Sequence, residues 1–203
     1  MSHRYIYTTQ VGTRADTNDP GRPWGLYFAD DELTEDAARA RYALEPQDRQ
    51  NGFIGIVRVE DGEERPSAYL QMGPRANGAR LHNLGPHGVI QVSYTWDAYH
   101  EPPRASDPYE GDASQVFLGS IVWFTYPDEN QFWRQSKNVG SVMYDFRENG
   151  YARADESVRG GFGNPDEVTT REFENVDVSA NWFDIPEFGD WEAFFHPEGD
   201  EEE

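Results

Sequence analysis

Residues 116–126 form a run that is apolar on both faces of an extended chain, and this run constrains the fold more than any other feature. In a β-strand, successive side chains point to opposite faces of the sheet. One face of this strand would carry Val116, Leu118, Val122 and Phe124, and the other Phe117, Ile121 and Trp123. Strands that are apolar on both faces are typical of a sheet that is covered on both sides. The run therefore predicts a central strand in a β-rich core.

Two Xaa-Gly pairs predict tight hairpins, because Asp-Gly and Asn-Gly favour the positive φ angles of two-residue turns. Residues 89–96 alternate between large apolar and polar side chains, as a half-buried strand does. The predicted hairpins have strands at 53–59 and 67–72 around Asp61-Gly62, and at 141–147 and 151–155 around Asn149-Gly150.

Four further segments read as strands, at residues 4–9, 24–28, 79–84 and 168–178. The last of these includes Glu172 and Glu174, and charged side chains are a common defence of edge strands against unwanted pairing. We therefore expect residues 168–178 to lie at an edge of the sheet.

The segment 33–44 is the one convincing helix in the sequence. Thr34 is a good N-cap residue, acids follow it in the first turn, and Arg39 and Arg41 lie near the end, where they oppose the helix dipole. The apolar side of this helix is narrow, so we expect it on the surface of the domain.

These elements predict an all-β fold, namely a single-domain sandwich or jelly roll of about 8–10 strands with one short helix near 33–44. A closed barrel shares the same pattern, and an α+β fold with the helix packed on one face of a sheet is the alternative. A chain of 203 residues fits one large domain. We expect residues 1–195 to form this domain and residues 196–203 to be a solvated acidic tail.

The charge balance is strongly acidic. Thirty-eight acidic residues against seventeen basic ones give a net charge of −21, and Lys137 is the single lysine. We interpret this surface as that of a protein in a halophilic cytosol or a hypersaline medium, where molar salt shortens the Debye length to about 3 Å. A nucleic-acid mimic that binds a basic partner and an ordinary acidic protein are the alternatives. Direct binding to nucleic acid is disfavoured, because a polyanion needs a basic surface.

The chain has no cysteine, which excludes disulfides, thiolate nucleophiles and cysteine-metal sites. Residues 1–10 lack the apolar core of a signal peptide, and no apolar run reaches the length of a membrane span. We therefore expect synthesis in the cytoplasm, without a recognisable secretion signal and without a membrane span.

A small group of histidines and a glutamate is the candidate metal site. Histidine and glutamate sets bind zinc or iron on β-barrels such as the cupins, although this chain lacks the closely spaced His-x-His pair of those barrels. A turn at Gly85 and Pro86 separates the first two histidines, so their relative facing does not follow from spacing. The candidate ligands are His82, His87, His100 and Glu101.

The chain carries more large aromatic side chains than a small core needs, and two sets of them are candidate interface residues. Trp and Tyr dominate the energetics of protein–protein interfaces, but the same rings are equally suited to cover the domain's own sheet. The candidates are Phe132, Trp133, Trp182, Phe188, Trp191, Phe194 and Phe195.

No motif for nucleophilic catalysis or phosphate binding is present, and the many acids make carboxylate pairs uninformative. Asp97 is the acid of most interest. It lies between Trp96 and Tyr99, where burial raises the pKa of a carboxyl or where a sugar can bind; a solvent-exposed acid at a strand end is the simpler interpretation.

The absence of a catalytic constellation favours a non-enzymatic structural or assembly protein of a halophile or its virus, such as a jelly-roll capsid subunit located in the virion. Its partners would be further copies of the chain or other coat subunits, and no cofactor is expected. The alternative is a cupin-like β-barrel that binds a small molecule or a metal in a halophilic cytosol. An acidic inhibitor of a basic partner is the third hypothesis.

Overall fold

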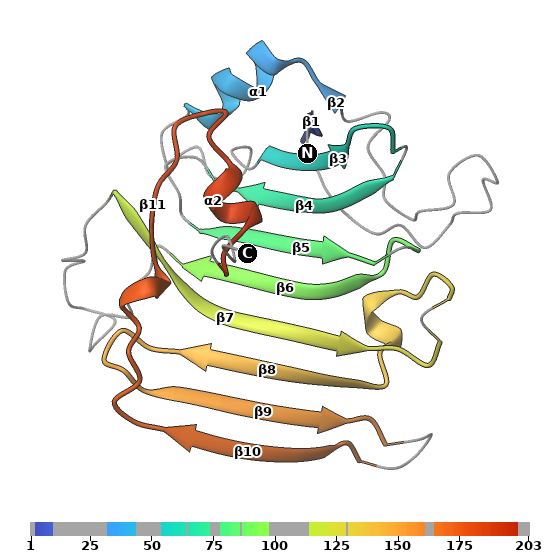
Figure 1. Ribbon diagram of the computed structural model, residues 1–203, viewed down its shortest axis with the longest axis vertical. Helices are drawn as coiled ribbons and strands as arrows, with labels where there is room; N and C mark the ends of the chain where they lie inside the picture. The colour runs from blue at the N-terminus through green and yellow to red at the C-terminus, as the bar shows by residue number, and fades with distance from the viewer. Residues whose placement is uncertain are drawn as a thin grey trace.

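The strands of the computed structural model join into one antiparallel sheet, which has eleven strands within the described residues (Figure 1). The structure describes residues 3–9, 32–43, 54–63, 65–73, 78–85, 87–97, 114–128, 130–160 and 165–198. The longer strands are β1 (His3–Thr8), β3 (Ile54–Glu60), β4 (Pro66–Met72), β5 (Ala79–Leu84), β6 (Ile90–Asp97), β7 (Gln115–Thr125), β8 (Gly140–Phe146), β9 (Ala152–Val158) and β10 (Glu167–Phe173). Two short strands, β2 (Glu32–Leu33) and β11 (Trp182–Asp184), pair with β1 and β7.

The strand order is that of a meander. From β3 to β10 each strand pairs with its neighbours in the sequence, and β1 is added beyond β3. Both predicted hairpin turns are present, with φ angles of 83° at Gly62 and 80° at Gly150, which glycine adopts without strain. The predicted all-β class is therefore confirmed, and the order of the strands in a single sheet is a finding of the structure. The predicted strand at 24–28 lies outside the described residues.

The predicted helix is confirmed as α1 (Glu35–Tyr42). The Thr34 hydroxyl accepts a hydrogen bond from the amide of Ala37 at 3.3 Å, and Arg39 pairs with Glu35 at 3.0 Å. Ala38 is the buried residue of this helix, so α1 lies on the surface as expected. The described residues also form α2 (Glu192–Phe195) and the 3-10 helices η3 (Gln135–Lys137) and η4 (Ser179–Asn181).

One face of the sheet is covered by the C-terminal segment, in which β11 pairs with the start of β7 and the chain then returns to place α2 over the first strands (Figure 1). The rings of Trp191 and Phe194 are fully buried in this layer. They pack on apolar side chains that point up from successive strands of the sheet. The sheet's contribution to this core is Ile54, Ile56, Ala68, Leu70, Met72, Ala79, Leu81, Tyr94, Trp96, Val116 and Leu118.

The opposite face of the same strands has a smaller core. Val57, Val59, Tyr69 and Ile90 are its buried members. The hydroxyl of Tyr126 donates a hydrogen bond to the carbonyl of Ile90 at 2.8 Å, which fixes the end of β7 against β6. The first strands of the sheet are thus apolar on both faces.

Strand β7 departs from the prediction in two ways. Its register with β6 shifts at Gly119, because Trp96 faces Leu118 whereas Thr95 faces Ser120. The additional residue of this irregularity moves Leu118 and Ile121 to the same face, where both belong to one core cluster. The predicted separation of these two side chains onto opposite faces is therefore wrong. The strand is also closely covered only near its start, and from Gly119 onward its side chains are half-buried or exposed.

The other end of the sheet is open. Strand β10 forms the edge beyond β9, and all seven of its residues are exposed. This confirms the predicted edge strand, although the strand ends at Phe173, because the chain turns at Asn175 with a φ of 59°. The sheet therefore has a covered end, β1 and β3 to β6, and an uncovered end, β8 to β10.

Candidate functional site

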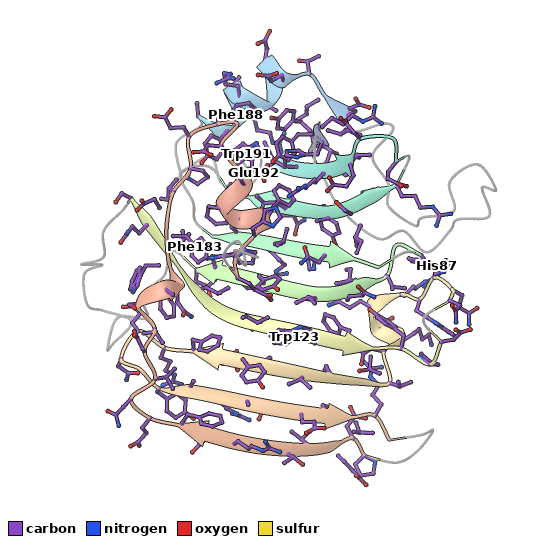
Figure 2. All side chains as sticks on the ribbon, viewed as in Figure 1. His87, Trp123, Phe183, Phe188, Trp191 and Glu192 are labelled. Atoms are coloured by element: carbon purple, nitrogen blue, oxygen red, sulfur yellow. The ribbon has the colours of Figure 1, made fainter. Side chains whose placement is uncertain are left out.

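An apolar surface continues on the uncovered end of the sheet, on the same face as the main core. Ile121 and Trp123 of β7 face Tyr94 and Val92 of the core. Following the register outward, Trp123 faces Val142 on β8. Figure 2 shows Trp123 below α2, where no described helix or strand crosses the sheet. We call this surface the bare face; its members are Trp123, Val142, Tyr144, Phe146, Ala154, Val158 and Phe173.

The rings of the bare face contact each other. The Tyr144 ring lies 5.6 Å from that of Trp123 in an edge-to-face arrangement, and 6.4 Å from that of Phe146 in a stacked one. At the outer strands, 54% of Val158 and 44% of Phe173 is exposed. The same face also carries Glu156 opposite Val142, and Glu167, Thr169 and Arg171 on β10, so polar side chains interrupt the apolar ones there. Exposed apolar surface with a polar rim marks a site of interaction. The bare face can therefore bind an apolar surface of a partner.

A polar cluster joins α2 to the covered end of the sheet. The carboxylate of Glu192 accepts a short hydrogen bond from the Tyr5 hydroxyl, and lies 2.8 Å from Nε2 of His3 and 3.5 Å from Nη1 of Arg58. Nε2 of His196 lies 2.7 Å from the same Arg58 nitrogen. Sequence reasoning missed this cluster because its members come from opposite ends of the chain.

The electrostatics of this cluster favour a charged carboxylate. Partial burial alone would raise the pKa of Glu192, but the hydrogen bond from Tyr5 and the charges of Arg58, His3 and His196 lower it overall. Burial, followed by the bond to Glu192, raises the pKa of Tyr5. A phenol that holds its proton beside an ionised carboxylate makes a strong hydrogen bond. The cluster therefore fastens α2 onto β1 and β3.

A pocket of about 320 Å³ lies at the ends of β4, β5 and β6, away from the Glu192 cluster. Asp97 is the last residue of β6 and is exposed on one side. Burial of its carboxyl raises the pKa of Asp97, and the charge of Arg80 opposes this effect. Asp97 is thus an exposed acid at a strand end, which was the simpler interpretation of the sequence, and its pKa is raised as well. The residues that line the pocket are Gln71, Gly78, Ala79, Arg80, Thr95, Trp96 and Asp97.

The four predicted metal ligands are only partly described. His82 is buried on β5, where Nδ1 lies 2.6 Å from the hydroxyl of Ser93 and the ring packs 4.6 Å from that of Tyr69. Burial lowers the pKa of His82 to about 4. His87 lies in the turn before β6, and His100 and Glu101 lie outside the described residues. No group of three metal-binding side chains occurs among the described residues, and the metal site stays a prediction.

The predicted interface residues of the C-terminal segment belong to the core of this chain. Trp191 and Phe194 have no exposed area and Phe195 is 5% exposed, so these rings have no surface to offer a partner. Phe188 stacks on Tyr7 with ring centres 5.2 Å apart. From the sequence, these residues could lie in the core of the chain or at an interface with a partner. In the structure they lie in the core.

The other predicted interface residues are half-buried. The ring of Trp182 packs edge-on against Phe117 at 5.0 Å. Phe132 and Trp133 lie between β7 and β8, where the indole N–H of Trp133 donates to the carbonyl of Asp128 at 2.7 Å. Tyr144 and Phe146 are half-buried in the same way and lie on the bare face, but sequence reasoning did not single them out. Their alternate spacing in the Asn149-Gly150 hairpin was the signal that pointed to a common face.

No known family model matches this chain, and no curated protein or solved structure is significantly similar to it. Among the described helices, none combines the length and the apolar character that crossing a membrane requires. The fold and the surface thus define an all-β protein with a half-covered meander sheet, and function must be argued from that geometry.

Proposed function

We propose that this chain is a non-enzymatic structural or assembly protein of a halophile or its virus, and that it assembles through β8 to β10. The observation that carries this proposal is the bare face, an apolar surface that continues the core face of the sheet but has no covering element among the described residues. A half-covered sheet of this kind is completed by a neighbour in an assembly.

The titratable groups of the described residues support a structural role. The largest cluster, around Glu192, binds α2 to the sheet, and the pocket found among the described residues lies elsewhere. Catalysis by general acid and base needs such groups to reach a bound substrate. The cluster is instead occupied by contacts within the chain.

The net charge of −21 makes assembly dependent on salt. Copies with this charge repel each other at low ionic strength, whereas a Debye length of about 3 Å in molar salt screens the repulsion. Apolar contact is not weakened by screening. The charge and the bare face are therefore compatible in a hypersaline environment.

Light scattering after size-exclusion chromatography in about 3 M salt, where screening is nearly complete, tests the proposal. We expect multimers that dissociate as the salt is diluted. Phe173→Asp places a charge on the bare face and is expected to weaken assembly. Val139→Asp places the same charge on an exposed apolar side chain outside β10 and serves as the control. A strict monomer for the unmodified chain in 3 M salt would falsify the proposal.

A second candidate function rests on the pocket beside Asp97. The Asp97 carboxyl and the Arg80 guanidinium offer an acceptor and a donor to a small polar molecule such as a sugar. Titration with simple monosaccharides, followed by tryptophan fluorescence, tests this role. Sugar binding that is lost in Asp97→Asn would support this role. Fluorescence that stays unchanged with every sugar would contradict it.

A further inference from the structure

The outer edge of β10 is regular and accessible. Its seven residues pair with β9 in an unbroken register, from Glu167 opposite Val158 to Phe173 opposite Ala152. The strand includes no proline, and no described strand pairs with its other side. An edge of this kind presents a row of backbone N–H and C=O groups that another strand can bind.

The side chains of β10 divide into two rows. The register with β9 places Glu167, Thr169, Arg171 and Phe173 on the side of the bare face. Val168, Thr170 and Glu172 point to the other side, where the Thr170 hydroxyl donates to Asp155 at 2.6 Å and Glu172 accepts from the Tyr151 hydroxyl at 2.9 Å. The two charged residues on the side of the bare face, Glu167 and Arg171, are opposite in sign.

This arrangement is self-complementary. When an edge strand pairs antiparallel with a second copy of itself, facing residues lie on the same side of the sheet, so the two-fold axis passes through a residue pair. An axis at Thr169 places Glu167 of each copy opposite Arg171 of the other. An axis at Arg171 would place the two guanidinium groups against each other, and an axis at Thr170 pairs neither charge with its opposite.

We propose that β10 pairs with β10 of a second copy across a two-fold axis at Thr169, which joins two sheets into one. This inference rests on the proposed assembly function and names its first contact. On the side of the bare face the facing charges are opposite, and opposite charges on facing positions stabilise a pair of strands. On the other side the same register brings Glu172 opposite Asp166, a like-charge pair that molar salt screens.

The pairing also fixes how the two bare faces lie. A two-fold axis perpendicular to the sheet leaves the bare faces of both copies on the same side. The seam between them is polar, because Glu167, Thr169 and Arg171 of each copy lie on this side of β10. The dimer therefore has one apolar surface on each side of a polar seam, and both surfaces are open to further subunits.

Single cysteines test the register directly, because the natural chain has none. At the proposed axis, the two Thr169 positions face each other with Cα atoms about 4.5–5.5 Å apart, which a disulfide spans. The two Thr170 positions are diagonal neighbours about 7–8 Å apart, beyond its reach. In 3 M salt under mild oxidation, we expect Thr169→Cys to form a covalent dimer and Thr170→Cys to stay uncross-linked.

The outcomes separate this inference from the function on which it rests. Multimers by light scattering without a Thr169→Cys cross-link would refute the β10 pairing and leave the assembly function standing. Cross-linking of Thr170→Cys without cross-linking of Thr169→Cys would contradict the proposed axis, because it would place the axis at Thr170. A monomer at every salt concentration would refute both the β10 pairing and the assembly function.

A charge exchange in the Thr169→Cys background adds an independent test. At about 0.3 M salt the Debye length is roughly 5 Å and still spans a cross-strand pair. Glu167→Arg or Arg171→Glu alone opposes like charges twice, and we expect cross-linking to slow by roughly tenfold. The double exchange restores the opposite charges and the rate. A double variant as slow as either single one contradicts the pairing.

Discussion

The two ends of the sheet are built from the same kind of strand but reach different environments. At the covered end, Leu70 and Leu81 are fully buried beneath Trp191 and Phe194. At the uncovered end, β8 carries large rings that remain half-buried, and every residue of β10 is exposed. The difference arises from a single segment, because the residues that follow β11, including α2, cover the first strands and leave the last three uncovered.

This contrast separates stability from interaction. Burial of apolar area drives folding in proportion to the area removed from water, so most of the stabilisation comes from the covered end. The apolar side chains of the uncovered end gain less from folding. Their free energy of burial is available to an assembly.

The largest expected effect is at the covered end. Trp191→Ala removes a fully buried ring, and we expect the free energy of unfolding to fall by about 3–5 kcal/mol. Trp123→Ala removes the same side chain from the bare face, with an expected loss of roughly 1 kcal/mol. Urea unfolding of both variants in molar salt measures the difference. Equal losses would show that the bare face is covered as well as the core.

The next effect is the pH dependence that His82 gives to the covered end. Burial first, and the charge of Arg80 second, lower the pKa of His82 from 6.5 to about 4, so the folded state holds the neutral ring. Its stabilisation is complete above pH 6.5 and falls as the pH drops to 4, by on the order of 3 kcal/mol. We expect His82→Gln to reduce the dependence of the free energy of unfolding on pH, as measured by urea unfolding between pH 7 and 4. This range spans the two pKa values. His87→Gln, in a turn outside the core, is the control, and a slope unchanged by His82→Gln would contradict the assignment.

A smaller effect is expected from the cluster that binds α2. The lowered pKa of Glu192 stabilises the folded state above the ordinary carboxyl pKa of 4.5, and this contribution is lost as the pH falls through the lower folded value. Because Glu192 is half exposed, we expect Glu192→Gln to cost roughly 1 kcal/mol at neutral pH. Thermal unfolding measures the loss, with Glu187→Gln on the same segment as control. A stability equal to that of the control would show that apolar packing alone holds α2.

The smallest effect on stability is expected at the edge. Phe173→Ser changes a side chain that is 44% exposed, and we expect the free energy of unfolding to stay within about 0.5 kcal/mol. The same variant is expected to weaken assembly in molar salt. If Phe173→Ser lowered the stability but left assembly unchanged, the uncovered end would contribute to folding and not to interaction.

The local elements could be predicted because their signals lie within a few residues. Alternation predicted a strand at 89–96, and β6 spans Ile90–Asp97. The Asn149-Gly150 turn located the β8–β9 hairpin, and Thr34 marked the start of α1. Turn-forming residues and helix caps act on residues close in the sequence, so they can be recognised without knowledge of the fold.

The coverage of the sheet could not be predicted, because it depends on contacts between distant segments. The rings of Trp191 and Phe194 suit a core and an interface equally, and only the return of α2 across the sheet decides between them. The irregularity at Gly119 was present in the sequence as a glycine within a strand, which is a known sign of a bulge. The partners of Glu192 come from β1, β3 and the residue after α2, and no local pattern joins them.

The return of α2 to the first strands has a consequence during protein synthesis. A meander forms by adding hairpins in order, so the strands can pair as they leave the ribosome. The main apolar face of the nascent sheet stays open until residues 182–195 emerge, since Phe183, Trp191 and Phe194 provide its cover. Translation that stops after β10 therefore yields a sheet with both ends uncovered, a product that chaperones must hold or proteases remove.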